Sequence, residues 1–381
     1  MKLAQKTYKQ EISKYLKNNN IYFYWKARVA LYAILKAINV KKGDEIVLPA
    51  YTCVVVPNAI LYLGAKPVYV DVDKDTYNAS VKSIKSAVTK RTKAIICQNT
   101  YGLSTDVEKI SVFGKKNKIF TIEDCAHGFG GTYNKKPNGT YCDAAFYSTQ
   151  WNKPYSTGIG GFALINNDKL ISNIEKVNQK LVSPGFLEQV LLFILIKFHK
   201  YFLNSNSYWF LMRLYRWLSS KNLILGSSSK NEVKNIIMPE NYFKTMGNVQ
   251  IKQGIHSIKK LEESLKLRKT NSIMYTKFLK KNQKNYIKEK YFKNHSFLKY
   301  PILVRDRKSF INLAEKEHIK LGDWFISPLH PVVNNLKLWN FKIENYPNSK
   351  YISSSVINLS TDESNIEKIL LFLEKNIKNI I

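Results

Sequence analysis

The chain has 381 residues, enough for a large apolar core and, by ordinary length, for two domains. Its 60 basic and 28 acidic side chains give a formal net charge of +32, which favours anionic substrates and raises the question of nucleic acid. The lysines are dispersed along the chain and no nucleic-acid-binding motif accompanies them, so we exclude nucleic acid as a partner.

The first part of the chain alternates predicted helices with predicted strands. An aromatic run at 22–25 opens an amphipathic helix that continues to residue 38, with apolar residues at helical spacing. Apolar strands follow within 42–61, 63–73 and 92–102, separated by turns and helical segments. This alternation predicts an α/β fold in which a mostly parallel sheet carries helices on both faces.

An aspartate ends the next predicted strand. Residues 118–124 form a β-branched run that ends at Asp124, and Ala126 and His127 follow directly. Ligands of open α/β sheets gather at the carboxyl ends of strands. A carboxylate there can pair with a protonated pyridine nitrogen and keep a pyridoxal phosphate ring an electron sink. Alternatively, Asp124 caps the next helix and His127 is a hydrogen-bonded core histidine.

A single lysine lies between two apolar runs further along the chain. Residues 143–148 predict a short strand and residues 161–165 a second one after a glycine-rich bend, so Lys153 lies in a loop at a strand edge. Desolvation and nearby positive charge lower the pKa of an amine at such a place and keep part of it nucleophilic. The alternative is a solvated surface lysine, which is what most lysines of the chain must be.

Together these motifs resemble those of a known family. Their order along the chain is Glu123-Asp124-Cys125-Ala126-His127, Cys142-Asp143-Ala144-Ala145 with Ser148, Lys153, and Thr157-Gly158-Ile159-Gly160-Gly161. This order and spacing resemble the DegT/DnrJ/EryC1/StrS family of pyridoxal-phosphate-dependent sugar aminotransferases. The resemblance implies fold type I, the aspartate aminotransferase fold. It places a large cofactor-binding domain over 1–245 and a small C-terminal α+β domain with its linking helix over 246–381.

The resemblance also implies a role for each matching residue. Lys153 holds the cofactor as an imine and later moves a proton, and Asp124 keeps the ring nitrogen protonated. His127 lies near the ring hydroxyl, Ala126 below the ring, Ser148 at the phosphate and Gln150 in a polar position near the lysine. The substrate-side candidates are Thr52, Tyr101 and His330, and no metal site is expected.

Two parts of the phosphate site depart from the family pattern. The helix start that carries Ser-Gly in the family is Lys26-Ala27-Arg28 here; its amides can still bind a phosphate and Lys26 adds charge. Alternatively, this is a packing helix and Lys26 is solvated. The family's Asn-Tyr-Arg segment, which reaches the neighbouring subunit's phosphate, corresponds to Asn241-Tyr242 placed several residues too early. We therefore expect a rearranged phosphate site.

Residues 183–235 predict an insertion relative to the family's common core. Apolar runs at 190–196 and 208–218 predict two short helices rich in Phe, Trp and Leu, with Lys and Arg on their flanks. Neither run reaches the ~20 residues needed to cross a bilayer. The helices either pack on the partner subunit or under the active-site rim, or make peripheral membrane contact through 190–218. We favour packing, because aromatic stripes at helical spacing are more often buried against protein.

The last third of the chain predicts the small domain. A long amphipathic helix covers 246–265, and a strand at 300–305 and a helix at 310–316 follow. A loop then carries His330, which either touches the substrate or braces the loop. The final helix is expected to begin at Thr361, where cap residues and early acids gather.

The cysteines and the first ten residues indicate the cellular compartment of the protein. Cys53, Cys97, Cys125 and Cys142 lie in or beside predicted buried strands without metal-ligand spacing, which indicates reduced core thiols. The first ten residues lack the apolar core of a signal peptide. We therefore expect a cytoplasmic protein.

The function implied by the resemblance is amination of a keto sugar. The substrate is nucleotide-linked, glutamate is the amino donor, the enzyme is a homodimer, and the pathway makes surface glycans or polysaccharides. A lysine rather than a histidine at 153 favours amine transfer over dehydration. Two alternatives are kept: the same chemistry on a lipid-linked or lipid-derived carbonyl compound at the inner face of a membrane, and a non-catalytic relative with a binding role.

Overall fold

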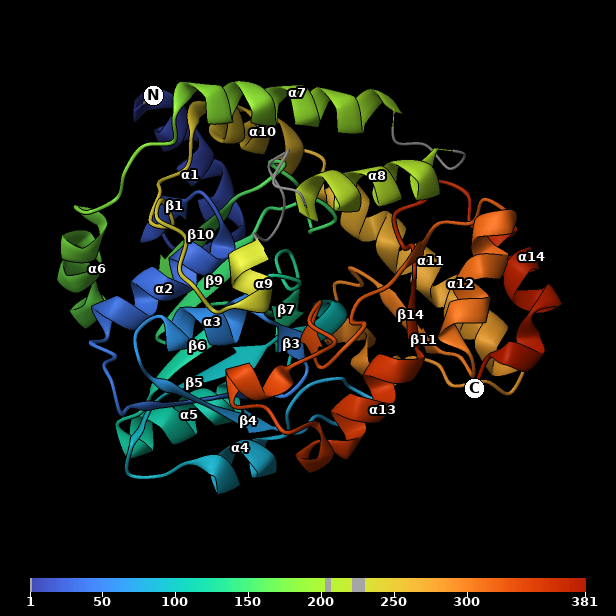
Figure 1. The fold of residues 1–381 in the computed structure, drawn as a ribbon, viewed down its shortest axis with the longest axis horizontal. Coiled ribbons are helices and arrows are strands. Elements are labelled where there is room, and N and C mark those ends of the chain that lie inside the picture. Colours follow the sequence, from blue (N-terminus) through green and yellow to red (C-terminus); the bar gives the residue numbers. More distant parts are fainter. Residues whose placement is uncertain (1, 203–206, 221–229) are drawn as a thin grey trace.

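The centre of the molecule is a twisted seven-stranded sheet. The computed structural model describes residues 2–202, 207–220 and 230–381 (Figure 1). The strand order is β1-β10-β9-β6-β5-β2-β4, in which β10 runs antiparallel to both of its neighbours and the pairs from β9 to β4 are parallel. The strands are β1 (Ile21–Tyr24), β2 (Glu45–Pro49), β4 (Lys66–Val70), β5 (Thr92–Gln98), β6 (Phe120–Asp124), β9 (Ala144–Ser148) and β10 (Gly161–Ile165). The predicted mostly parallel sheet is confirmed.

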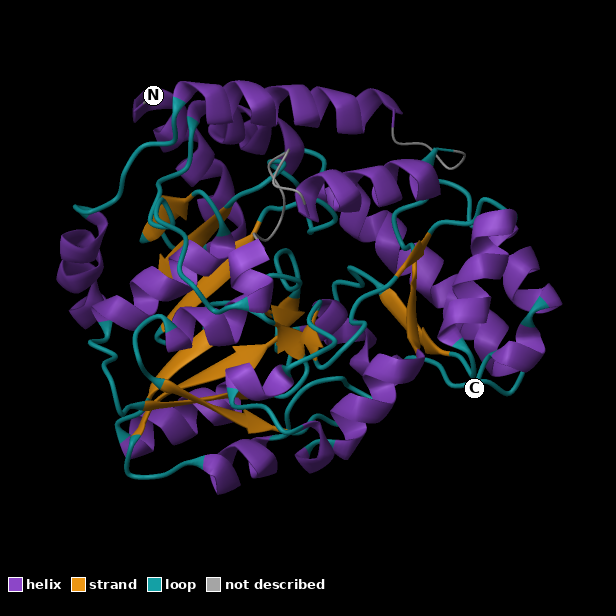
Figure 2. Ribbon diagram, viewed as in Figure 1, coloured by secondary structure: helices purple, strands orange, loops and turns teal. Residues whose placement is uncertain are grey.

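Helices cover both faces of this sheet, as Figure 2 shows. Side chains alternate along each strand, so Ile46 and Leu48 of β2 enter one core and Val47 enters the other. The helices of the first core are α2 (Ala27–Ala37), α3 (Val55–Leu61) and α6 (Ile171–Asn178); those of the second are α4 (Val81–Ala87) and α5 (Val107–Asn117). A third apolar cluster joins α1 (Lys2–Leu16) and α10 (Asn248–Ile258) to strands β1 and β10.

The aromatic run near the N-terminus is a strand. The prediction that it opens a helix is wrong, because Ile21–Tyr24 pairs with β10 and helix α2 begins only at Ala27. Large aromatic residues suit a half-buried strand. Phe23 illustrates this, since its ring lies 4.9 Å from the ring of Tyr8 and 6.3 Å from that of Phe162.

The C-terminal part builds a separate core around a three-stranded sheet ordered β11-β14-β12. The helix predicted over 246–265 is two helices, because α10 ends at Ile258 and α11 starts at Leu261. The final helix begins at Glu367 rather than at Thr361, whose hydroxyl donates to two main-chain carbonyls instead of capping a helix. The elements are α11 (Leu261–Lys281), β11 (Tyr300–Leu303), α12 (Arg307–Lys316), β12 (Leu321–Gly322), α13 (Pro347–Ser355), β14 (Val356–Leu359) and α14 (Glu367–Lys375). The domain boundary at 245/246 stays a prediction.

A short parallel pair ties the two parts together. Strand β13 (Leu329–His330) pairs with β3 (Thr52–Cys53), which belongs to the connection between β2 and α3. His330 therefore lies beside Cys53. A small hairpin, β7 (Thr132–Tyr133) with β8 (Lys136–Pro137), lies beyond β6. Cys53, Asp124 and His330, at the ends of strands β3, β6 and β13, line the same cavity.

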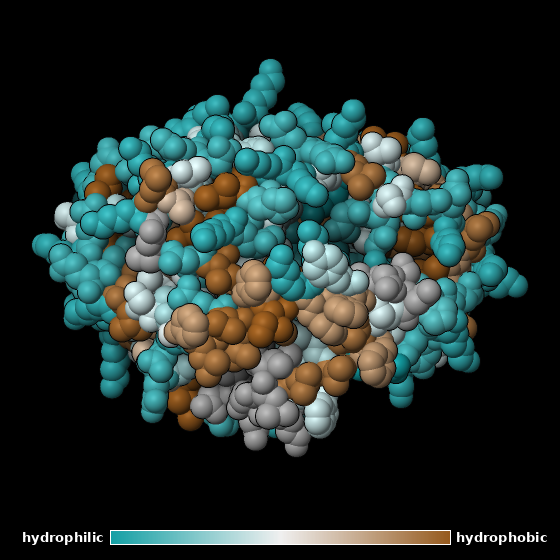
Figure 3. Space-filling model, turned by 90° about the horizontal axis from the view of Figure 1, so that it is seen from above, coloured by the Kyte–Doolittle hydropathy of each residue, from teal (hydrophilic) through white to brown (hydrophobic). Residues whose placement is uncertain are grey.

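The predicted insertion contains α7 (Phe186–Phe202), α8 (Tyr208–Ser220) and α9 (Lys230–Lys234). The two predicted apolar helices are thus confirmed. Seen from above, the molecule shows a broad apolar area on the side that α7 and α8 form (Figure 3). Within the described residues, no helix is both long enough and apolar enough to cross a membrane. None of the four cysteines forms a disulfide, and all except Cys53 are buried.

Candidate active site

Asp124 ends the central strand of the large sheet. The side chain is 6% exposed, and Oδ1 accepts a hydrogen bond of 2.9 Å from the amide of Ala126. Strands β5, β6 and β9 run parallel here, so their carboxyl ends meet at one edge where ligands bind. Burial raises the pKa of Asp124 to about 6, although the Ala126 amide and the Lys153 ammonium lower it.

Lys153 lies near the tip of the connection between β9 and β10. Thr149 and Thr157 close the base of this loop, since their hydroxyls lie 2.7 Å apart and the amide of Thr157 donates to the carbonyl of Thr149. Asn152 has a left-handed φ of 60°, which asparagine tolerates, and the chain turns there directly before the lysine. The strand, loop and returning strand predicted around Lys153 are confirmed.

Two side chains from the linking helices hold the far limb of this loop. Arg268, 4% exposed, donates from Nη2 to the carbonyl of Pro154 at 3.2 Å. Ser257 donates from Oγ to the carbonyl of Ser156 at 2.8 Å. The position of Lys153 therefore depends on α10 and α11 as well as on the sheet.

An aromatic wall lies below the lysine. The rings of His127 and Trp324 are parallel within 2° with centroids 5.0 Å apart, and Nζ of Lys153 lies 4.2 Å from the centroid of Trp324. His127 accepts at Nδ1 from the amide of Tyr101 at 3.2 Å, which places the proton of the neutral ring on Nε2. Burial and then Lys153 lower the pKa of His127 well below its usual range, so the ring stays neutral.

The start of α2 is docked onto the strand beside Ser148. Gly161 pairs with Ser148, and a Cβ on Gly161 would collide with the backbone of Ala27. Only glycine allows this approach, which brings the first amides of α2 next to the end of β9. A helix N-terminus with free amides binds anions.

Arg28 adds a buried charge at this helix start. Nη1 of Arg28 lies 2.5 Å from Oε1 of Glu232, and the two side chains are 5% and 2% exposed. Lys26 is half-buried, and burial with the nearby Arg28 lowers its pKa to about 8. Whether Lys26 serves a phosphate or is a solvated residue of a packing helix stays a prediction.

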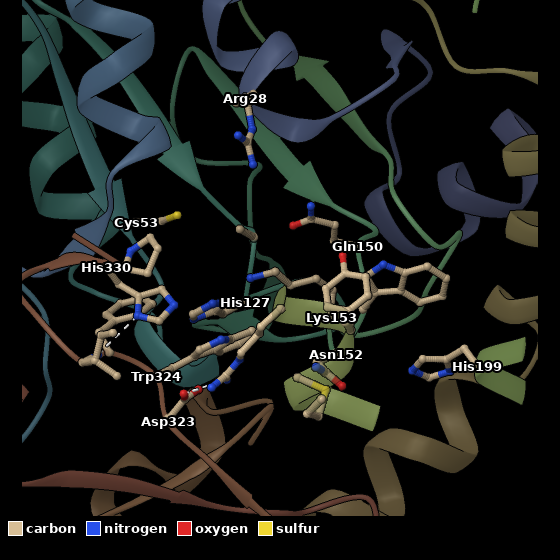
Figure 4. Close-up of a pocket in the computed structure, with 18 of the residues that line it drawn as sticks. Arg28, Cys53, His127, Gln150, Asn152, Lys153, His199, Asp323, Trp324 and His330 are labelled. Carbon is tan, nitrogen blue, oxygen red and sulfur yellow. Dashed lines mark hydrogen bonds and ion pairs between the residues drawn. The ribbon is translucent and has the colours of Figure 1, made fainter. Parts of the chain in front are cut away.

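These groups surround one cavity of about 440 Å³, drawn in Figure 4. Arg28 enters it from one side, Lys153 reaches across it, and His127 and Trp324 stack on the opposite side. The roof comes from α7 and α8, through Leu195, Phe198, His199, Tyr208, Leu211, Met212, Tyr215 and Arg216. His199 stacks on Trp151 with centroids 4.8 Å apart.

Burial governs the charge of the amine. It lowers the pKa of Lys153 to about 8 from the ordinary value of 10.5, while Cys53 and Asp124 raise it and Lys299 lowers it further. A substantial part of Lys153 is therefore neutral and nucleophilic near pH 8. The pKa of Lys153 is therefore lowered, as the sequence predicts for an amine at this place.

The cavity brings together most residues predicted as the site. Those that line it are Arg28, Asp124, Ala126, His127, Gln150, Lys153 and His330. Lys26, Ala27 and Ser148 lie beside it at the helix start and strand end already described. Their individual roles stay predictions.

Thr52 and Tyr101 lie behind the cavity wall. Thr52 is 1% exposed, and its hydroxyl has no hydrogen-bond partner among the described residues. Tyr101 donates to the carbonyl of Trp324 at 2.6 Å, and its hydroxyl lies 2.7 Å from that of Tyr51. These contacts hold the loop that carries Trp324. His330 both lines the cavity and accepts at Nδ1 from the amide of Ile326 at 3.3 Å.

Several lining residues were not predicted. Trp324 is the most important of them, and its only sequence signal is an aromatic pair shortly before the loop of His330. The sequence left a place under the active-site rim open as an alternative for α7 and α8 and did not identify their lining residues, because an apolar side chain over a cavity has the same sequence pattern as one in a core. Asp323 pairs with Arg216 of α8 at 2.7 Å and connects the roof to the Trp324 loop.

The arrangement fits a pyridine cofactor that carries a phosphate. A buried carboxylate, a neutral histidine and an amine of lowered pKa face one cavity, and the helix start cradled by Gly161 supplies anion-binding amides. Among the described residues, no group of three or more His, Cys, Asp or Glu side chains is placed to hold a metal ion.

Comparison with protein families gives one clear match. The sequence profile of the DegT/DnrJ/EryC1/StrS aminotransferase family covers residues 4–188 and 223–367. The unmatched residues 189–222 contain most of α7 and all of α8.

Two curated relatives with named activities match over shorter segments. GDP-perosamine synthase of Escherichia coli O157:H7 is 41% identical over 143 residues, 38% of this chain and 39% of that protein. UDP-2-acetamido-2-deoxy-3-oxo-D-glucuronate aminotransferase of Pseudomonas aeruginosa is 38% identical over 149 residues, 39% of this chain and 42% of that protein. The matched segments thus span less than half the length of these relatives.

Solved structures match over nearly the whole chain. A DegT DnrJ EryC1 StrS aminotransferase from Brucella abortus has a TM-score of 0.75 at 18% identity, covering 98% of this chain and 90% of that one. GDP-4-keto-6-deoxymannose-3-dehydratase with a trapped PLP-glutamate geminal diamine has a TM-score of 0.73 at 19% identity, covering 97% and 92%. These likenesses establish the predicted aminotransferase fold type I.

Proposed function

Since the chain belongs to the DegT/DnrJ/EryC1/StrS aminotransferase family, we propose that it is a pyridoxal-phosphate-dependent aminotransferase. Its acceptor is a nucleotide-linked keto sugar and its amino donor is glutamate. The relatives named for a GDP-sugar and for a UDP-linked 3-oxo sugar support the acceptor. The neighbour solved with a trapped PLP-glutamate adduct supports the donor.

The observation that carries the proposal is the pairing of Lys153 with Asp124 at one cavity. An amine with a pKa near 8 and a buried carboxylate are the two groups that this chemistry requires of the protein. Both lie at positions that match the family's motifs, on elements that the family profile covers.

Each residue has a distinct task in this reaction. Pyridoxal phosphate, when bound, supplies a conjugated ring that accepts negative charge from the reacting carbon. With the cofactor bound, the Asp124 carboxylate would keep the ring nitrogen protonated, and His127 could donate from Nε2 to the ring hydroxyl. The first amides of α2, with Arg28, bind the phosphate, and Glu232 orients the Arg28 guanidinium.

Lys153 moves the proton. With cofactor and substrate bound, Nζ as a neutral amine would accept a proton from the substrate and, once protonated, would give it back, acting first as base and then as acid. Its place over the Trp324 ring keeps the amine on one side of the cavity.

Incubation with glutamate and a panel of GDP- and UDP-linked keto sugars tests the proposal. We expect 2-oxoglutarate and one amino sugar in equal amounts, detected by mass spectrometry, and neither product with Lys153→Ala. A protein that binds the cofactor but releases no 2-oxoglutarate with any nucleotide keto sugar would contradict the acceptor class.

A second candidate acceptor is a lipid-linked or lipid-derived carbonyl compound. The observation that favours it is the apolar roof, where Leu195, Phe198, Leu211 and Met212 face the cavity. Polyprenyl-linked and long-chain ketones therefore belong in the same panel. Turnover of these alone would favour this acceptor over the nucleotide sugar.

We also propose that the enzyme is a homodimer. The support is family membership, because active sites of this fold are shared between subunits. Light scattering of the purified chain measures the mass directly, and a monomer under assay conditions would contradict the proposal.

A further inference from the structure

An exposed apolar stripe runs along α7. Leu187, Leu191, Ile194 and Tyr201 recur at spacings of four, three and seven, which places them on one face of the helix, and Phe186 and Phe193 border this face. Their exposure is high: Ile194 is 54% exposed and Phe193 beside it 50%. The exposed apolar residues of this helix outside the cavity lining are Phe186, Leu187, Leu191, Phe193, Ile194, Tyr201 and Phe202.

Helix α8 adds a second stripe on the same side of the molecule (Figures 1 and 3). Phe210, Leu214 and Trp217 follow helical spacing, and their exposures are 64%, 37% and 56%. Monomeric proteins rarely leave so many large apolar residues contiguous and uncovered, so the outer face of α7 and α8 marks a contact surface.

The opposite sides of the two helices are fixed to the body. Glu188 of α7 pairs with Lys244 at 2.7 Å, and Leu192 is buried in a cluster with Trp25 and Ile159. On α8, the indole of Trp209 donates to the carbonyl of Ile319 at 3.0 Å. Packing under the active-site rim, one form of the packing predicted from the sequence, therefore explains one side of each helix and leaves the outer side open to a partner.

The charged side chains of α7 and α8 indicate which class of partner this face can bind. On these helices Glu188 is paired with Lys244, Arg213 with Glu315 and Arg216 with Asp323, so the cations left without an ion pair among the described residues are Lys197 and Lys200. The amines of Lys197 and Lys200 lie 5.4 Å from the centroids of Phe193 and Tyr201, so cations border the apolar stripe. A second copy docked face to face would bring the same two lysines to this face. An anionic surface is complementary.

We propose that the outer face of α7 and α8 binds the surface of an anionic lipid bilayer. The helices lie in the interface with their apolar stripes in the acyl boundary and their lysines at the headgroups. The inner faces of the same helices line the cavity of Lys153, so a bound membrane lies directly outside the roof of the active site. The inference uses only the outer face and is independent of which acceptor the enzyme uses.

Co-sedimentation of the full-length protein with vesicles tests the proposal. We expect binding to vesicles of phosphatidylglycerol and phosphatidylcholine and little binding to phosphatidylcholine alone. The triple variant Phe193→Ser, Ile194→Ser and Phe210→Ser changes exposed residues outside the cavity lining, and we expect its partition to fall about tenfold or more. Lys197→Gln with Lys200→Gln should weaken binding mainly at low salt.

A matched control variant shows whether vesicle binding depends on the exposed apolar residues of α7 and α8 or on exposed apolar residues anywhere on the molecule. Val112→Ser, Leu338→Ser and Leu371→Ser remove three residues that are 63%, 49% and 58% exposed elsewhere, and this variant should bind like the wild type. Circular dichroism and cofactor absorbance verify that both variants fold. Equal vesicle binding by wild type and the α7–α8 variant overturns the proposal. So does a dimer that the α7–α8 variant breaks while neither protein binds vesicles, since the face is then an interface between copies.

Discussion

At the scale of single residues, the amine of Lys153 is the group whose charge matters most. Burial lowers its pKa to about 8, and only the neutral amine can attack the aldehyde of the cofactor. We predict that the rate of cofactor capture by the cofactor-free protein rises with pH and levels off above a midpoint near 8. Stopped-flow absorbance measures this rate. A rate still rising steeply at pH 10, as for an ordinary lysine, would show that the amine is solvated.

Asp124 gives a second prediction, on stability. The pKa of Asp124 is about 6 in the folded protein and 3.8 ordinarily, so the folded state favours the protonated acid. The contribution of this group to the free energy of unfolding is therefore fully present below pH 3.8 and is lost as the pH rises through 6. At pH 8 the buried carboxylate therefore costs stability. We predict that Asp124→Asn raises the free energy of unfolding of the cofactor-free protein by roughly 1–3 kcal/mol at pH 8, and by less at pH 5.

Urea unfolding at the two pH values measures this difference. The same variant should bind pyridoxal phosphate with an altered spectrum, because asparagine cannot keep the ring nitrogen protonated. A less stable Asp124→Asn protein at pH 8 would mean that the carboxylate makes net stabilising contacts.

At the scale of elements, the contact of α2 with β10 positions the phosphate end of the site. A Cβ at Gly161 would meet the backbone of Ala27 and the carbonyl of Tyr147, neither of which can give way easily. We predict that Gly161→Ala destabilises the protein by about 1–3 kcal/mol and weakens pyridoxal phosphate binding about tenfold. Denaturant unfolding and spectroscopic titration provide the two readouts.

Gly185 provides the control for that substitution. A Cβ there would meet no heavy atom closer than Glu188 Oε2 at 3.6 Å, so Gly185→Ala should leave cofactor affinity unchanged. If Gly161→Ala binds the cofactor like the wild type, the helix start of α2 does not hold the phosphate.

The central elements could be predicted from the sequence because their signals are local. The strand ending at Asp124 and the loop of Lys153 follow from apolar runs bounded by glycine and polar residues. The aromatic run before α2 was misassigned, since pairing with β10, a tertiary contact, decides between strand and helix there. Trp324 could not be predicted as a site residue, because a loop residue far along the chain reaches His127 only in the folded molecule.

At the scale of the whole molecule, the net charge of +32 should assist an anionic acceptor. Long-range attraction is screened by salt, so we predict that KM for a nucleotide-linked acceptor rises about threefold or more between roughly 0.05 and 0.5 M NaCl, with kcat nearly constant. An uncharged ketone serves as control and should show little change. A salt-independent KM for the nucleotide-linked acceptor would leave the charge without a role in substrate capture.

The central claim concerns one covalent link, between the cofactor and Lys153. The most direct measurement is absorbance of the protein loaded with pyridoxal phosphate, followed by borohydride reduction and peptide mass spectrometry. We predict a visible band that glutamate removes, that Lys153→Ala lacks, and that reduction converts to a cofactor-labelled peptide containing Lys153. An unchanged band in Lys153→Ala, or a label on another lysine, would contradict it.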